Sequence, residues 1–271
     1  MQRSLSRLIP VGAIALTCSA AFAGTPLPNP PFSSGGFVPP DSLVLRQEVS
    51  VGKVLTKYAT SIAKCDQVAV NGLQLAYEPA NPTKIQDLQD AWNLCRGKAL
   101  DRYTVSRDKL LLKGTPACLD QTGIDAIKAQ LDAQFPLLNP IVYCDGDAAM
   151  PDPVTMLNIP DKKQESVGEI AAAKVVTKAG LSGGKCFTKA ATTAFKLGGT
   201  LPPEVLAKIT ACFDKANAAS DAALAKLDQT QKLPGCLSLA TAQALGNAAV
   251  GLAGQFSDET YCASPSGAFV E

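Results

Sequence analysis

The chain has 271 residues, of which 25 are basic and 24 acidic, and it contains no histidine. A charge this close to zero lacks the basic excess with which proteins neutralise phosphates, so we expect no nucleic-acid role. Without histidine, Ser-His or Cys-His nucleophile activation and histidine metal ligation are excluded. The sequence therefore predicts no enzyme, cofactor or metal site.

Residues 1–23 have the pattern of a secretory signal peptide. Arg3 and Arg7 precede a short apolar stretch, and Ala21-Phe22-Ala23 ends it with the small residues that signal peptidase accepts. No other stretch is apolar enough over a sufficient length to span a membrane. We therefore expect a chain exported to the periplasm or beyond it, with no transmembrane anchor after cleavage. A Pro-, Gly- and Ser-rich leader then occupies residues 24–40.

Eight cysteines remain after the expected cleavage: Cys65, Cys95, Cys118, Cys144, Cys186, Cys212, Cys236 and Cys262. An even number in an exported chain indicates disulfide bonds. The successive spacings are 30, 23 and 26 in the first four cysteines and 26, 24 and 26 in the second four. In both sets a Pro-x-Cys-Leu segment contains the third cysteine and a Tyr-Cys pair contains the fourth.

We interpret this pattern as a tandem duplication with a period near 118 residues. It divides the chain into a first module at 41–147, a linker at 148–160, a second module at 161–265 and a tail at 266–271.

Long proline-free runs within each module carry apolar residues at helical spacing. They predict an all-α fold in which each module is a long helical hairpin followed by a shorter third helix. The clearest stripes are Val51, Leu55, Tyr58, Ile62, Cys65 and Ala69 in the first module, and Val205, Ile209, Cys212, Ala216, Ala219 and Ala223 in the second.

The position of the hairpin turns favours one disulfide pattern among the three possible in each module. Cys65 and Cys95 are equidistant from Ala80, within a proline-rich turn, and Cys186 and Cys212 are equidistant from Gly199. The two cysteines of each pair would therefore lie at the same height on antiparallel helices. Elimination leaves the pairs Cys118–Cys144 and Cys236–Cys262, so that every crosslink would stay within its own module.

Two Ser-x-x-Lys segments occupy corresponding positions in the two modules, at Ser61–Lys64 and Ser182–Lys185. A Ser-Lys dyad needs no histidine, which makes these segments the sharpest catalytic candidates. A third copy at Ser106–Lys109 has no counterpart, which indicates that the pattern arises readily by chance. The segment GLSGG at 180–184 matches a nucleophile elbow, but its setting is helical rather than strand–turn–helix.

Four features of the chain carry a resemblance to a known group of proteins: the segment GGFVPPD at 35–41, the two Lys-Cys pairs, the Pro-x-Cys-Leu segments and the Tyr-Cys pairs. The group that the chain resembles consists of exported bacterial helical repeat proteins that contain cysteines and have no assigned activity. The resemblance covers most of residues 35–265 and rests on structural motifs, so it implies no functional residue.

We therefore expect a non-catalytic binding or structural scaffold protein. Its partner would be an unknown protein or envelope component, and its ligand and oligomeric state stay open. Two alternatives remain. The first is a carrier of an apolar small molecule in a helical cavity, enclosed by the Ala- and Gly-rich second module. The second is a Ser-Lys hydrolase.

Overall fold

The computed structural model describes residues 41–77, 82–116, 119–144, 162–198 and 202–261. The expected signal peptide, leader and linker lie outside these residues. The described residues form no strand, which confirms the all-α class. They contain six helices: α2 (Ser42–Tyr77), α3 (Pro82–Lys113), α4 (Gln121–Val142), α5 (Lys162–Lys196), α6 (Pro203–Gln229) and α7 (Leu239–Thr260).

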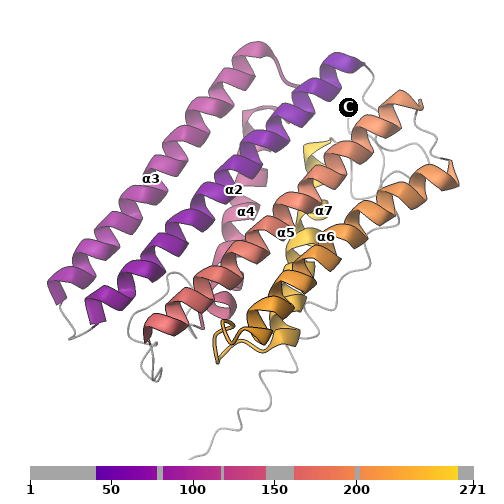
Figure 1. The fold of residues 1–271 in the computed structure, drawn as a ribbon. Coiled ribbons are helices and arrows are strands. Elements are labelled where there is room, and N and C mark those ends of the chain that lie inside the picture. The colour runs from indigo at the N-terminus through magenta and orange to yellow at the C-terminus, as the bar shows by residue number, and fades with distance from the viewer. Residues whose placement is uncertain (1–40, 78–81, 117–118, 145–161, 199–201, 262–271) are drawn as a thin grey trace, which may run out of the picture.

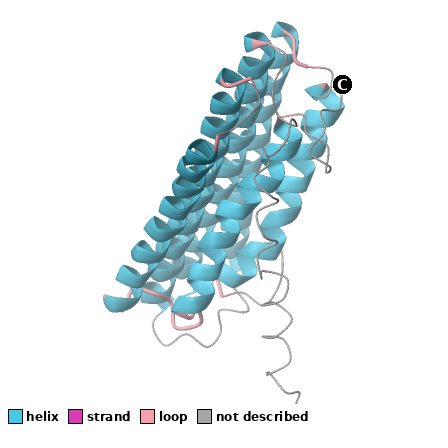
Figure 2. Ribbon diagram, turned by 90° about the vertical axis from the view of Figure 1, so that its right-hand side faces the viewer, coloured by secondary structure: helices cyan, strands magenta, loops and turns pink. Residues whose placement is uncertain are grey.

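The helices form two layers (Figures 1 and 2). The long helices lie side by side in the order α3, α2, α5, α6, and the shorter α4 and α7 lie behind them (Figure 1). At the centre of the front layer α2 packs against α5, while α7 packs against both α5 and α6. The two helices at the centre run in opposite directions, as their colour gradients show (Figure 1).

Helix α2 begins at a capping carboxylate and buries the apolar stripe that the sequence predicts. Asp41 Oδ1 accepts hydrogen bonds from the backbone N–H groups of Leu43 (2.7 Å) and Val44 (2.9 Å). Burying one large apolar side chain stabilises a fold by about 1.5–3 kcal/mol. The predicted stripe is confirmed at Val51, Leu55, Tyr58, Ile62, Cys65 and Ala69, which are all buried.

The stripe predicted for α6 is wrong at its second half. The buried residues of this helix are Ile209, Phe213, Ala216, Ser220 and Leu224, whereas Ala219 is exposed. The helix is rotated so that Phe213 and Leu224 face the core. These two side chains remove far more apolar area from water than alanines do, and this larger gain decides the orientation.

The apolar core is shared between the two halves of the sequence. Leu45 of α2 packs into a cluster with Phe187, Phe213 and Tyr261 of the second half. A second cluster joins Val70 and the end of α4 to residues of α5, α6 and α7. The halves therefore do not form two separate helical bundles.

Three disulfides lie within the described residues. Two of them, Cys65–Cys95 and Cys186–Cys212, confirm the hairpin pairing, with Cα atoms 5.7 and 5.8 Å apart. The third joins Cys144 to Cys236, with a Cα–Cα distance of 5.8 Å, so the pairings Cys118–Cys144 and Cys236–Cys262 are wrong. Cys118 and Cys262 themselves lie outside the described residues.

The reason for this difference is the position of the third helices. Pairing by elimination assumes that the remaining cysteines bond within their own module. Both third helices do pack against their own hairpin, but α4 and α7 also contact each other, and the end of α4 meets the segment that leads into α7. As a result, the third disulfide links the two halves covalently.

Candidate ligand-binding site

A cavity of about 220 Å³ lies at the centre of the molecule, between α2 and α5 of the front layer and α4 and α7 behind. Among the residues that the structure describes, no charged one lines it. Its walls consist of Gly52, Leu55, Thr56, Ala59, Thr60, Ala63, Leu131, Gln134, Phe135, Leu138, Asn139, Val142, Tyr143, Ala173, Val176, Thr177, Gly180, Leu181, Gly184, Thr188, Ala249, Leu252, Thr260 and Tyr261.

Residues at corresponding positions of the predicted repeat line this cavity from both halves. Thr56 and Thr177 are 121 positions apart, and Tyr143 and Tyr261 are 118 apart. The same two offsets relate Gly52 to Ala173, Leu55 to Val176, Ala59 to Gly180, Ala63 to Gly184, Leu131 to Ala249 and Val142 to Thr260. The cavity thus lies at the junction of the halves and not inside the second module, where the sequence suggested it.

Small residues keep the cavity open. Ala59 and Ala63 of α2 and Gly180 and Gly184 of α5 contribute little side-chain volume to its walls. A Cβ atom placed on Gly184 would meet no atom within 4 Å, so there is room for a side chain at this position.

Most polar groups in the walls already have partners within the protein. The hydroxyls of Thr60, Thr177 and Thr188 donate to the carbonyl oxygens four residues earlier, at 2.7, 2.7 and 3.0 Å. The Tyr261 hydroxyl donates to Thr188 Oγ1 at 3.1 Å, and Asn139 Nδ2 donates to Asp66 at 3.0 Å. Because buried polar groups need hydrogen bonds, these internal bonds leave a cavity that suits an apolar occupant.

Two buried tyrosines, Tyr143 and Tyr261, line the cavity, and the buried Glu48 lies near Tyr261. Glu48 is fully buried and neither of its carboxyl oxygens has a hydrogen-bond partner; burial raises its pKa to about 8. The pKa of Tyr261 is raised to about 12, mainly by burial; the Thr188 hydrogen bond opposes this rise and the nearby Glu48 adds to it. The pKa of Tyr143 is raised by burial, and then by Asp66 and Glu169. Glu48 therefore keeps its proton at neutral pH, which limits the charge near the cavity.

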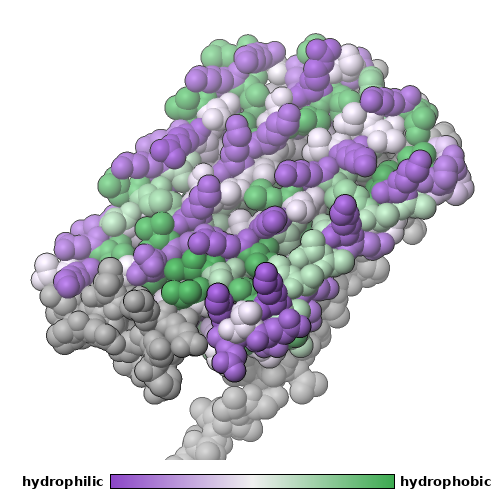
Figure 3. Space-filling model, in the orientation of Figure 1, coloured by the Kyte–Doolittle hydropathy of each residue, from purple (hydrophilic) through white to green (hydrophobic). Residues whose placement is uncertain are grey.

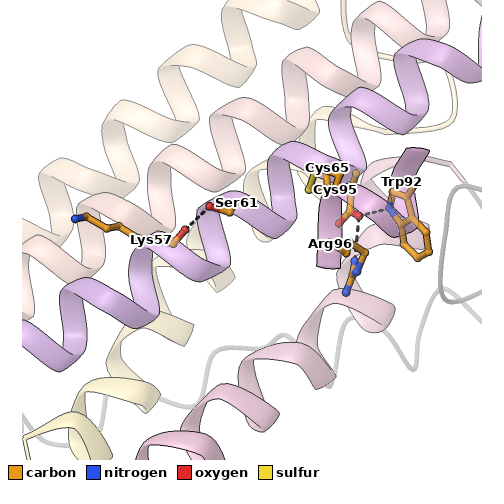
Figure 4. The surroundings of a disulfide bond; sticks show 7 residues. Lys57, Ser61, Cys65, Trp92, Cys95 and Arg96 are labelled. Atoms are coloured by element: carbon orange, nitrogen blue, oxygen red, sulfur yellow. Dashed lines mark hydrogen bonds and ion pairs between the residues drawn. A yellow bond between two sulfur atoms is a disulfide. The ribbon is translucent and has the colours of Figure 1, made fainter. Parts of the chain in front are cut away.

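The buried carboxylate of Asp66, next to the first disulfide, joins three helices through hydrogen bonds. Two of its partners, Trp92 and Arg96, lie close to this disulfide (Figure 4). Asp66 of α2 accepts hydrogen bonds from Trp92 Nε1 (2.8 Å) and Arg96 (3.1 Å) of α3, and from Asn139 of α4 (3.0 Å). The Arg96 guanidinium also stacks on the Trp92 ring at 4.9 Å. The sequence patterns did not indicate this network. The available signal was a carboxylate four residues after Ile62, on the buried stripe.

The structure does not assemble the predicted Ser-Lys candidates into a catalytic site. The Ser61 hydroxyl donates to the Lys57 carbonyl oxygen at 2.8 Å (Figure 4), and the Ser182 hydroxyl donates to that of Lys178 at 2.9 Å. Lys64 and Lys185 are exposed, and in the part of the chain that the structure describes neither serine hydroxyl bonds to a lysine ammonium. The GLSGG segment lies inside the continuous helix α5, not at a strand–helix turn.

One group of potential metal ligands occurs among the described residues. Ligand atoms of Cys144, Glu169 and Cys236 lie within 4.8 Å of one another. The two sulfur atoms are bonded to each other, so they offer no thiolates to a metal. This group is best described as a disulfide with a neighbouring carboxylate.

The chain matches no protein-family model, and no curated protein or solved structure is significantly similar to it. Among the described helices, none combines the length and the apolar character that crossing a membrane requires. The three disulfides fit an oxidising compartment.

Proposed function

We propose that this protein is a non-catalytic, exported binding protein that holds an apolar small molecule in the cavity between its two halves. The observation that carries the proposal is the cavity itself: the described residues that line it are uncharged and come from both halves, and most of their polar groups are already hydrogen-bonded. An apolar cavity of about 150 Å³ is enough to bind benzene, so about 220 Å³ accommodates a somewhat larger apolar group.

The structural frame supports a binding role because it fixes the walls before any ligand arrives. The disulfides Cys65–Cys95 and Cys186–Cys212 hold α2 to α3 and α5 to α6. The Cys144–Cys236 disulfide holds the end of α4 to the segment before α7. Walls that are ordered beforehand lose little conformational entropy on binding, and this increases affinity.

Titration with the uncharged fluorophore N-phenyl-1-naphthylamine tests the proposal. We expect a saturable rise in fluorescence with one site per chain. The variant Gly184→Leu places a side chain in the cavity wall and should weaken binding at least tenfold. Gly97 provides the matched control, because it lies on an exposed part of α3 where a Cβ atom also meets nothing within 4 Å.

Both variants replace a helical glycine, so they should be equally well folded by circular dichroism. The result against the proposal is an absence of saturable binding, or a Gly184→Leu variant that binds the fluorophore as tightly as Gly97→Leu. A protein that only serves as a structural scaffold would give that result.

A further inference from the structure

A groove of about 490 Å³ lies next to the cavity, along α2 and α3. Thr56, Thr60 and Leu181 line both the groove and the cavity, so the two spaces share a wall.

The groove differs from the cavity in its charge. Lys57 and Lys64 of α2 and Arg102 of α3 line it, together with the hydroxyl-bearing Ser61 and Ser106, and none of the described lining residues is acidic. None of the three cationic groups forms an ion pair with a described carboxylate, so their charges are not neutralised within this part of the protein. The described residues that line the cavity, in contrast, carry no charge.

The exposed charges of α2 and α5 beside the groove have the same sign, whereas α3 also carries the exposed Asp101 and Asp108. Over residues 42–72 of α2 and 166–196 of α5, the three carboxylates Glu48, Asp66 and Glu169 are fully buried. The exposed charges of these two stretches are therefore all positive: Arg46, Lys53, Lys57, Lys64, Lys174, Lys178, Lys185, Lys189 and Lys196. Hydrophilic side chains project from this face between pale and apolar ones (Figure 3). Such a face attracts anions even though the whole chain is nearly neutral.

We infer that the ligand is an anionic amphiphile of the class of medium-chain alkyl carboxylates, with its apolar part in the cavity and its carboxylate in the groove beside Lys57, Lys64 and Arg102. This inference rests on the proposed function and adds the ligand's charge to it. The apolar part loses its contact with water in the cavity, while the head group gains up to three charge-assisted hydrogen bonds at a position that stays partly hydrated.

Competition between three octyl compounds and bound N-phenyl-1-naphthylamine tests this assignment. Octanoate, octanol and octyltrimethylammonium have the same chain and differ in head-group charge. Because three partly exposed ion pairs each contribute modestly, octanoate should bind roughly tenfold more tightly than octanol, and the cation most weakly. The advantage of octanoate should fall in 0.5 M NaCl, because salt screens exposed charges.

A triple variant, Lys57→Gln, Lys64→Gln and Arg102→Gln, should reduce the advantage of octanoate over octanol to less than about threefold and leave octanol binding unchanged. The matched control removes three exposed cations of α3 that line neither space, by Lys98→Gln, Lys109→Gln and Lys113→Gln. This control has the same net charge and should retain the preference.

The outcomes separate the two proposals. If the fluorophore and octanol bind and Gly184→Leu weakens both, but octanoate has no advantage, the head-group assignment is wrong and the proposed function stands. The assignment is also wrong if the control triple variant loses the preference as fully as the groove variant, since general attraction by the surface then explains it. If none of the compounds binds, the proposed function itself fails.

Discussion

Replacing Glu48 with leucine should stabilise the protein, and the gain should grow with pH. Glu48 is fully buried without a hydrogen-bond partner, and burial raises its pKa in the folded chain from 4.5 to about 8. Between these values the folded chain holds a proton that the unfolded chain has released. The free energy of unfolding therefore falls as pH rises from about 4.5 to about 8.

The magnitude follows from the two pKa values. Each pH unit between them corresponds to about 1.4 kcal/mol, so wild type should lose up to about 5 kcal/mol by pH 9 and about 3 kcal/mol by pH 7. Leucine at this position has no proton to release, and it places an apolar side chain among Leu45, Tyr261 and their neighbours. The variant should match wild type to within about 1 kcal/mol at pH 5 and exceed it by several at pH 9.

Urea denaturation followed by circular dichroism at pH 5, 7 and 9 measures these differences. Glu204→Gln is the control, because Glu204 is exposed in the first turn of α6 and its loss should change stability by only a few tenths of a kcal/mol. The reasoning is refuted if Glu48→Leu follows the same pH dependence as wild type, or if it is the less stable protein at pH 9.

Four further variants test the packing and the crosslinks by thermal or urea denaturation. Gly168→Ala should destabilise the protein by about 1–3 kcal/mol, because its methyl group would lie 2.7 Å from a backbone oxygen of the loop before α7. Gly184→Ala is the control and should stabilise the protein by about 0.5–1 kcal/mol, because alanine favours a helix and its methyl group meets no atom within 4 Å. Equal effects of the two variants would contradict the close approach of that loop. Asp66→Ala should destabilise the protein by about 3 kcal/mol, because it leaves the donors of Trp92, Arg96 and Asn139 without their acceptor. A loss of stability below about 1 kcal/mol would show that the network contributes little. Replacing Cys144 and Cys236 together with alanine should remove about 4 kcal/mol, because this bond closes a separation of 92 residues, and unchanged stability would contradict the link between the halves.

Local features of the fold follow from the sequence because they depend on short-range regularity. The apolar stripe of α2 depends only on the spacing of apolar residues within that helix, and the Asp41 cap depends only on residues at its start. The pairs Cys65–Cys95 and Cys186–Cys212 follow from the position of a single turn. None of these inferences requires knowledge of how distant helices pack.

Features that depend on the packing of distant helices could not be predicted in this way. Cys144–Cys236 requires α4 to lie beside α7, which no spacing within one module specifies. The prediction of the buried face of α6 was wrong because the spacing of its alanines does not determine which face packs against the core. The larger side chains of Phe213 and Leu224 do.

The candidate site was only partly visible in the sequence for the same reason. The Ala and Gly residues suggested a cavity, but its place between the halves depends on the antiparallel contact of α2 with α5. The basic groove was hidden because basic and acidic residues alternate along the chain. Only the fold shows that the carboxylates of α2 and α5 within residues 42–72 and 166–196 turn inward while the cations face outward.

Photocrosslinking with an uncharged alkyl diazirine tests the central claim most directly, because it reports where an apolar molecule lies. After irradiation and proteolysis of the oxidised protein, we predict adducts in residues 52–63 and 131–143 of the first half and in residues 173–184 of the second, with Gly184→Leu suppressing all of them. Adducts confined to one half, or concentrated on exposed apolar residues such as Leu94 and Leu112, would contradict a shared binding cavity between the halves.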